Sequence, residues 1–138
     1  MKFRSFEEMP MWQDARGLIN SIYSLTDRGT FSRDFGLKDQ IRRSAVSIMS
    51  NISEGYERAS KKEFAMFLGY AKGSAGELRS QLYIALDQGY ISSDEFQNAF
   101  KLVTEISSQL AKFSTYLRTT RPLRLAGIVA LSLLLFAI

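Results

Sequence analysis

The chain has 138 residues, of which 46% are hydrophobic, 12% aromatic and 23% charged. These fractions are typical of one folded domain and exclude a generally disordered chain. Cysteine and histidine are both absent, which excludes disulfides, thiolate or imidazole metal ligands, and cysteine or histidine catalysis. Enzymatic chemistry would have to depend on Asp, Glu, Lys, Tyr or Ser alone. A non-enzymatic helical interaction module that needs no cofactor is therefore the favoured class of function.

The net charge of +4 comes entirely from the carboxyl-terminal part of the chain. Residues 1–105 hold 14 basic and 14 acidic residues, whereas the remainder adds Lys112, Arg118, Arg121 and Arg124 and no acid. The basic balance is therefore weak evidence for a nucleic-acid partner. The first residues include acids and no apolar run, so no signal peptide is predicted and a cytoplasmic location is expected.

Apolar residues at helical spacing predict two helices in the first half of the chain. The first begins at Pro10, which suits an initial helical turn, and ends before Gly29. Its stripe comprises Met11, Ala15, Leu18, Ile22 and Leu25. Ser32 and Asp34 are the candidate caps of the second helix. The stripe of that helix comprises Ile41, Ala45, Ile48, Ile52 and Tyr56.

Two longer helices with clear heptad spacing follow. Ser60 and Glu63 form a capping-box pattern before the third helix, which ends at Gly89. Its seam comprises Phe64, Leu68, Ala71, Ala75, Leu78, Leu82 and Ala85. Ser92 or Ser93 caps the fourth helix, whose seam comprises Phe96, Ala99, Val103, Ile106, Leu110, Phe113 and Leu117. Such seams indicate helices that pack side by side.

Short connections between four helices favour antiparallel neighbours, and no segment alternates with the period of a strand. The sequence thus predicts an all-α fold, an up-and-down antiparallel four-helix bundle over residues 1–120. Gly73 and Gly76 lie inside the third helix, where each costs about 1 kcal/mol relative to Ala. The favoured interpretation is a close helix crossing within the bundle, and a ligand cleft over that crossing is the alternative.

The third helix also carries more large apolar residues than its seam requires. The surplus comprises Met66, Phe67, Tyr70, Tyr83 and Ile84. One apolar stripe is enough to close a bundle, so a second stripe predicts self-association into a homo-oligomer. Scattered exposed apolar residues are the alternative interpretation.

Polar residues at three- and four-residue spacing mark a candidate cluster between the second and third helices. They are Asn51, Glu54 and Arg58 on the second helix and Ser74 and Glu77 on the third. One interpretation is a buried hydrogen-bond network that fixes helix register, with Arg58 pairing a carboxylate. The other is a small catalytic or ligand-binding bundle that uses Glu54 and Glu77 as an acid–base pair. A metal site is not expected, because di-metal bundles usually require Glu-x-x-His motifs.

Five basic residues are candidate phosphate contacts. They are Arg42, Arg43, Lys61, Lys62 and Lys72, and a solvated face is the ordinary alternative. The tail over residues 121–138 contains 14 residues without charge. A helix of that length spans about 21 Å, whereas a bilayer core is about 30 Å thick. A membrane tail, a helix docked on the bundle and an unrelated extension all stay open.

Two sequence blocks identify a resemblance to a known family. The second helix reads Leu37-Lys-Asp-Gln-Ile-Arg-Arg-Ser-Ala-Val-Ser-Ile48 and then Ser50-Asn-Ile-Ser-Glu-Gly55. The third reads Ala71-Lys-Gly-Ser74, Glu77-Leu78 and Gln81-Leu82. These blocks resemble the bacterial four-helix-bundle proteins named for open reading frames in 23S rRNA intervening sequences, and the resemblance covers residues 3–118.

The resemblance implies an up-and-down bundle that assembles as a ring-like homopentamer without known enzyme activity. It links the chain to RNA through gene location, so structured RNA or an RNA-linked protein is the expected partner. The positions that match the family motifs form a candidate site that the resemblance implies is shared with the family. They are Asn51, Glu54, Gly55, Gly73, Ser74 and Glu77. The chain departs from the family pattern at Ser53, Ala75, Gly76 and Arg79, which changes the expected surface chemistry of the third helix and leaves the fold intact.

Overall fold

A computed structural model of the chain describes residues 3–120. Four helices make up this part: α1 (Pro10–Thr26), α2 (Phe35–Tyr56), α3 (Lys61–Asp87) and α4 (Ser93–Thr119). Two short 3-10 helices, η1 (Phe6–Glu8) and η2 (Phe31–Arg33), precede α1 and α2. No strand occurs within residues 3–120, so the predicted all-α class is confirmed.

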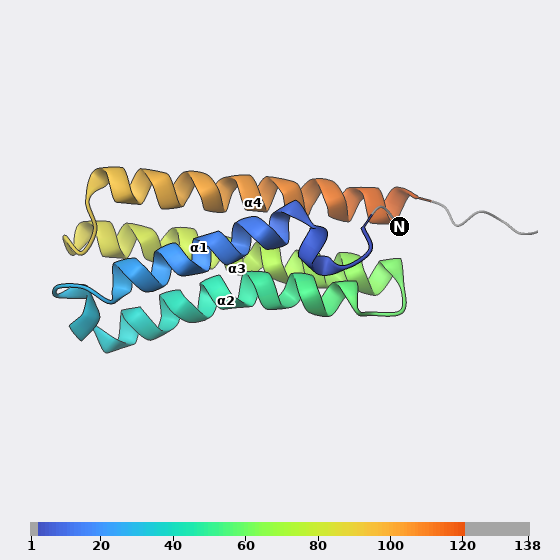
Figure 1. Cartoon of the computed structure of the whole chain (residues 1–138). Coiled ribbons are helices and arrows are strands. Elements are labelled where there is room, and N and C mark those ends of the chain that lie inside the picture. The colour runs from blue at the N-terminus through green and yellow to red at the C-terminus, as the bar shows by residue number, and fades with distance from the viewer. Residues whose placement is uncertain (1–2, 121–138) are drawn as a thin grey trace, which may run out of the picture.

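The helices lie side by side with successive helices running in opposite directions (Figure 1). Each helix packs against the next one in the chain, and α4 closes the bundle against α1. In Figure 1, α1 lies in front of α3 and is flanked by α4 and α2. This arrangement is the predicted up-and-down antiparallel four-helix bundle.

Polar side chains hold the start of each long helix, as the sequence patterns predict. Asp34 Oδ1 accepts the Leu37 N–H at 3.2 Å at the start of α2. Ser60 Oγ accepts the Glu63 N–H at 3.1 Å at the start of α3. The complete capping box stands at α4, where Ser92 Oγ accepts the Glu95 N–H and Glu95 accepts the Ser92 N–H. These caps use N–H groups that have no acceptor within the helix.

Both connections at the end of the bundle away from the N-terminus require glycine. Gly29 has a φ of 54° and Gly89 a φ of 72°, a region that L side chains rarely adopt. After α3, the Tyr90 N–H donates to Ala85 O at 2.9 Å and the Gly89 N–H to Leu86 O at 3.0 Å. This pair of bonds is a Schellman motif, which satisfies carbonyls that the helix leaves free.

Two side-chain contacts tie these connections to the helices beside them. The Tyr90 hydroxyl donates to Asp34 Oδ2 at 2.9 Å, and this bond raises the pKa of Tyr90. Arg28 pairs with Glu95 across the same end of the bundle. The pKa of Glu95 is lowered, chiefly by the Ser92 N–H and then by Arg28.

The predicted seams form the core. All seven seam residues of α3 are buried, and Leu18, Ile48, Leu78 and Ile106 are completely inaccessible. Phe31 and Met9, which lie outside the four predicted stripes, are buried as well and close the two ends. Leu25, Tyr56, Phe96 and Phe113 are only partly buried and pack against this core.

Aromatic rings form a continuous chain at the end of the bundle where the N-terminus lies. Phe6 contacts Trp12 and Tyr56, with ring centroids 5.4 and 6.3 Å apart. Tyr56 contacts Phe64 at 6.0 Å, and Phe64 contacts Phe113 at 5.5 Å. The chain of rings therefore links η1 and all four helices.

Candidate functional site

A short polar seam lies between α2 and α3 at the level of Ser47 and Ser74. Their hydroxyls are 2.8 Å apart, which joins the two helices directly. Asn51 Nδ2 donates to Ser47 O at 2.8 Å and to Ser47 Oγ at 3.0 Å. All three side chains are partly buried. The seam thus brings Asn51 and Ser74 into one network through Ser47, a residue that the sequence reasoning missed.

The two candidate carboxylates lie outside this seam. Glu54 pairs with Arg58 at 2.8 Å, and both side chains are about half exposed, at 53% and 44%. Glu77 is exposed and accepts a hydrogen bond from Gln81 Nε2 at 3.3 Å. The expectation of buried carboxylates is therefore wrong, because both glutamates project past the helix contact into solvent. Arg58 does pair a carboxylate, although at the surface.

Glu54 and Glu77 are also far apart along the bundle. Ser47 and Ser74 mark one level, Glu54 follows Ser47 by seven residues, and Glu77 follows Ser74 by three. Because α2 and α3 are antiparallel, these steps lead in opposite directions. At 1.5 Å per residue the two positions differ by about 15 Å along the axis. The arrangement does not support an acid–base pair made from these residues.

The close crossing of α2 and α3 occurs at Gly55. An added Cβ there would lie 2.7 Å from Phe67 Cβ and 2.8 Å from Phe64 Cδ2. Gly73 and Gly76 have no neighbouring atom within 4 Å of an added Cβ. The interpretation of Gly73 and Gly76 as a crossing inside the bundle is therefore wrong, because both face away from α2.

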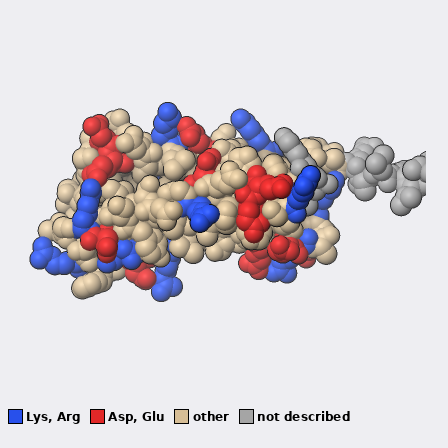
Figure 2. Space-filling model, viewed as in Figure 1, with Lys and Arg blue, Asp and Glu red and all other residues tan. Residues whose placement is uncertain are grey.

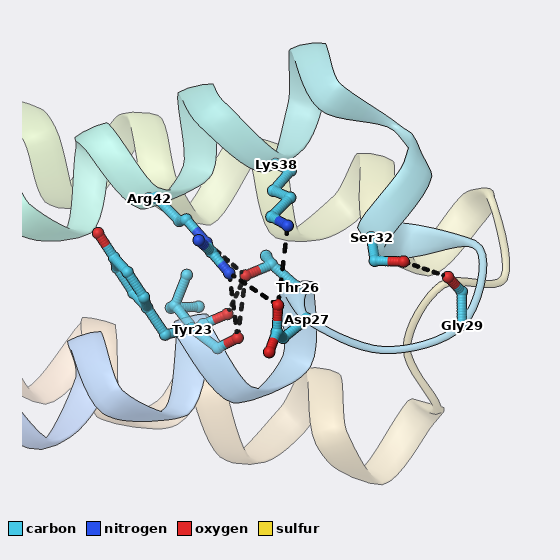
Figure 3. Close-up of polar contacts among 8 residues, drawn as sticks. Tyr23, Thr26, Asp27, Gly29, Ser32, Lys38 and Arg42 are labelled. Carbon is cyan, nitrogen blue, oxygen red and sulfur yellow. Dashed lines mark hydrogen bonds and ion pairs between the residues drawn. The ribbon is translucent and has the colours of Figure 1, made fainter.

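The five candidate phosphate contacts do not form one patch. Arg42 is held against the end of α1: Nε donates to Thr26 Oγ1 at 2.8 Å, and the guanidinium lies 4.1 Å from the Tyr23 ring centroid (Figure 3). Asp27 lies 3.7 Å from its Nη2 atom. Arg42 is thus a structural residue that neutralises the carboxyl-terminal end of α1.

The other basic candidates remain at the surface. Arg43 pairs with Asp39 at 2.8 Å within α2, and both side chains are largely exposed. Lys61, Lys62 and Lys72 are exposed and make no ion pair within the described residues. On the face that carries α1, basic and acidic side chains are interspersed, and neither sign covers an extended area (Figure 2).

Large apolar side chains remain exposed along the outer side of α3. Met66, Tyr70 and Ile84 are 44%, 52% and 47% exposed, and helical spacing places them in one stripe, which we call the outer stripe. Phe67 and Tyr83 belong to the flanks of the helix instead. Phe67 packs over Gly55 and lies 4.7 Å from the Arg58 guanidinium. Four of the five predicted surplus residues are thus exposed, with Tyr83 on the side toward α4, and Phe67 is partly buried.

The line along which α3 packs against α4, which we call the crease, carries a combination of residues that the sequence reasoning named separately but did not bring together. Arg79 is partly buried, and its guanidinium carbon lies 6.0 Å from the Phe100 ring centroid. Tyr83 and Phe96 complete an aromatic cluster beside it, with centroids 4.9 Å apart. The spacing of Lys72, Arg79 and Tyr83 on one side of the third helix is the signal that could have found it.

Residues 3–120 hold neither a group of metal-ligating side chains nor a helix suited to a membrane. No cluster of three or more acidic side chains in residues 3–120 is arranged to hold a metal ion. Among the helices within this range, none combines the length and apolar character needed to cross a bilayer. The predicted roles of residues 121–138 lie outside the described residues.

Comparison with known proteins identifies the family. A crystal structure from Bacteroides thetaiotaomicron VPI-5482, described as a protein with unknown function from the S23 ribosomal protein family, superposes with a TM-score of 0.69. The match is 23% identical and covers 75% of this chain and 97% of that chain, which shows a shared fold. No curated protein matches the sequence. The family profile for the 23S rRNA-intervening sequence protein matches residues 7–112. The chain therefore belongs to the 23S rRNA-intervening sequence protein family.

Proposed function

We propose that this protein is a non-enzymatic helical module that assembles with copies of itself through the outer stripe of α3. The observation that carries the proposal is the exposure of Met66, Tyr70 and Ile84 on one side of one helix. Met66 and Tyr70 are one turn apart and Ile84 lies about 21 Å farther along the same side of the helix, so the stripe offers apolar contacts at two places on one face. Exposed apolar surface gathered on one face commonly marks an interaction site. The core of the bundle is complete without these side chains, so their apolar surface is available to a partner.

The glycines of α3 support a helix as the docked element. Gly69, Gly73 and Gly76 all have open space where a Cβ would stand. Each makes α3 less stable by about 1 kcal/mol relative to alanine, and nothing within the bundle compensates. A backbone without side chains allows a second helix to approach closely. The proposed compensation is therefore contact with another copy.

The stoichiometry that we propose is a pentamer, as the family resemblance implies. A contact between two different faces of identical subunits closes into a ring when the rotation between them permits it. The outer stripe would supply one of these faces. The second face belongs to the next subunit and differs from the first.

Light scattering at micromolar concentration tests the assembly. We expect a mass of about 78 kDa, five times the 15.6 kDa of the chain. Replacing Met66 and Ile84 together with serine should lower the mass to that of one chain. Phe35→Ser is the matched control, because Phe35 is 75% exposed but lies at the start of α2. A wild-type protein of 15.6 kDa would refute the proposal.

Gly73→Ala separates folding from assembly. Alanine has open space at this position and should stabilise α3. The same methyl group would stand between the outer stripe and a docked helix. We expect a helix that is more resistant to urea and an assembly that dissociates at higher protein concentration. Unchanged assembly would place the contact elsewhere.

Association with RNA is the second function that we propose. Its support is the family description, which names 23S rRNA intervening sequences, and the exposed lysines Lys61, Lys62 and Lys72, which have no carboxylate partner within the described residues. Arg43 could join them after leaving Asp39. Arg42 is not part of this proposal, since α1 holds it. In the proposed oligomer, each subunit would present its own copy of these lysines on the surface of the assembly.

Salt dependence tests the RNA contact. Phosphate contacts release counterions, so affinity should fall steeply as salt rises. Fluorescence anisotropy with a labelled rRNA fragment should show weaker binding after Lys61→Gln and Lys62→Gln. Lys112→Gln, on α4, is the control of equal charge. Affinity that is absent at low salt, or independent of salt, would contradict the proposal.

A further inference from the structure

Arg79 is a partly buried cation on the side of α3 that faces α4, and no hydrogen bond from its side chain is made within the described residues. Its Nε atom is inaccessible to solvent and has no hydrogen-bond partner. The side chain makes no ion pair within residues 3–120, and its contact is the Phe100 ring at 6.0 Å. A guanidinium carries five donors in a planar fork that suits phosphate or carboxylate oxygens. The terminal Nη atoms are not among the inaccessible atoms, and an anion from outside the bundle would satisfy them.

Three aromatic rings stand next to this cation. Tyr83, Phe96 and Phe100 form a triangle with centroid separations of 4.9, 5.2 and 5.6 Å. Phe96 and Phe100 are partly buried and support Tyr83, which is 51% exposed. The cluster therefore presents one rigid ring with a free surface beside an unpaired guanidinium.

The cations extend along the crease. Lys72, Gly76, Arg79 and Tyr83 follow one another at steps of four, three and four residues, so they share the side of α3 that faces α4. Lys72 and Arg79 are two turns apart, about 10 Å. Gly76, between them, leaves open space above the backbone.

Acidic side chains do not interrupt this row. Glu77 is exposed on the other side of α3, where Gln81 of the same helix donates to it. Asp87 lies one turn beyond Tyr83, at the end of α3. Counted from the contact between Arg79 and Phe100 in antiparallel helices, Thr104 of α4 lies near the level of Gly76 and Ser107 near the level of Lys72. The crease thus combines two cations with an exposed aromatic ring.

We propose that this crease, formed by Lys72, Arg79 and Tyr83, binds a single-stranded segment of RNA. This inference rests on the RNA association proposed above. It adds that the bound RNA is single-stranded and that it binds along the crease. Arg79 and Lys72 would hold phosphates, and Tyr83 would stack against an unpaired base. Proteins that bind single strands combine cationic grooves with aromatic platforms in this way. A duplex offers no unstacked base to the ring.

The test uses the full chain and two fluorescein-labelled RNAs, a 12-nucleotide oligouridylate and a duplex of equal length. Anisotropy at low salt should show tighter binding of the single strand. Arg79→Gln and Tyr83→Leu should each weaken that binding by about fivefold or more, the range expected for a lost stack. Duplex binding should change by less than about twofold. Arg33→Gln is the charge-matched control, because Arg33 is exposed on η2.

Each outcome has a distinct meaning when thermal unfolding and light scattering accompany it. Loss of single-strand binding in folded variants of unchanged mass supports the crease. Binding of neither RNA by wild type overturns both RNA proposals. Equal single-strand binding by wild type and variants overturns the crease alone and leaves RNA association standing. A lower particle mass in Arg79→Gln would show that a carboxylate of a second copy occupies the crease, and the RNA assignment would be wrong.

Discussion

Replacing Gly55 with alanine tests the closest approach between α2 and α3. The new Cβ would lie 2.7 Å from Phe67 Cβ, whereas ordinary contacts begin at 3.4 Å, so the helices would have to separate by about 0.7 Å. Phe67 Cβ is the root of its side chain and cannot rotate away. Overpacking of this kind costs ~1–3 kcal/mol, and alanine's helix propensity offsets about 1 kcal/mol. We expect the free energy of unfolding to fall by up to about 2 kcal/mol, instead of rising as helix propensity alone would make it.

Urea denaturation followed by far-ultraviolet circular dichroism measures this change. Gly17→Ala is the matched control, because Gly17 lies inside α1 with open space where its Cβ would stand. That variant should gain about 0.5–1 kcal/mol from helix propensity alone. Both variants are compared at one protein concentration, since assembly adds to apparent stability. A Gly55→Ala protein as stable as Gly17→Ala would refute the close approach.

Three further predictions concern caps, pH and the polar seam. Ser92→Ala removes the oxygen that accepts the Glu95 N–H, and urea denaturation should show a loss of about 1 kcal/mol; an unchanged midpoint would contradict the cap. The pKa of Glu95 is lowered from 4.5 by the Ser92 N–H first and Arg28 second. The stability from Glu95 is therefore present above pH 4.5 and lost as the pH falls through the lower folded-state pKa. In Arg28→Gln this acid loss should be smaller in urea titrations against pH, and an unchanged profile would exclude the pair. A double-mutant cycle of Ser47→Ala and Ser74→Ala should give a coupling of about 0.5–1.5 kcal/mol in unfolding free energy, and zero coupling would refute the hydroxyl contact.

The fold could be predicted from the sequence because the apolar periodicity and the helix-capping residues indicate the same helices. The seam of α3 repeats at steps of four and three, and all of its members are buried. Asp34, Ser60 and Ser92 cap helices where the sequence places candidate caps. Agreement between local caps and global periodicity is what specifies one structure.

The candidate site was harder to predict from the sequence. It depends on the relative direction of α2 and α3 and on which residues of the two helices face each other. Asn51 and Glu54 are neighbours on α2, and Ser74 and Glu77 are neighbours on α3. Because α2 and α3 run in opposite directions, however, only one residue from each helix can lie at the shared level. Ser74 meets Ser47, which carries both glutamates away from each other.

The buried position of Gly55 could have been predicted from the heptad spacing of α2. Gly55 follows Ile48 by seven residues, so the heptad pattern already places it on the buried side of α2. Gly73 follows the buried Ala71 by two residues and therefore falls outside the seam. The role of Arg42 had no comparable signal. Its contacts with Tyr23 and Thr26 depend on how the end of α1 approaches α2 in three dimensions.

The chain of aromatic rings has a consequence for the order in which the protein can form during synthesis. Trp12 and Phe6 leave the ribosome early, and Tyr56 and Phe64 follow with the hairpin of α2 and α3. Phe113 contacts Phe64, and Phe3 contacts Phe113 across 110 residues of sequence. A growing chain can therefore close the α2–α3 hairpin long before the ring chain is complete. Phe6 and Trp12 can pack beside Tyr56 once α2 has formed, whereas the contact between Phe3 and Phe113 requires that nearly all of α4 has been translated.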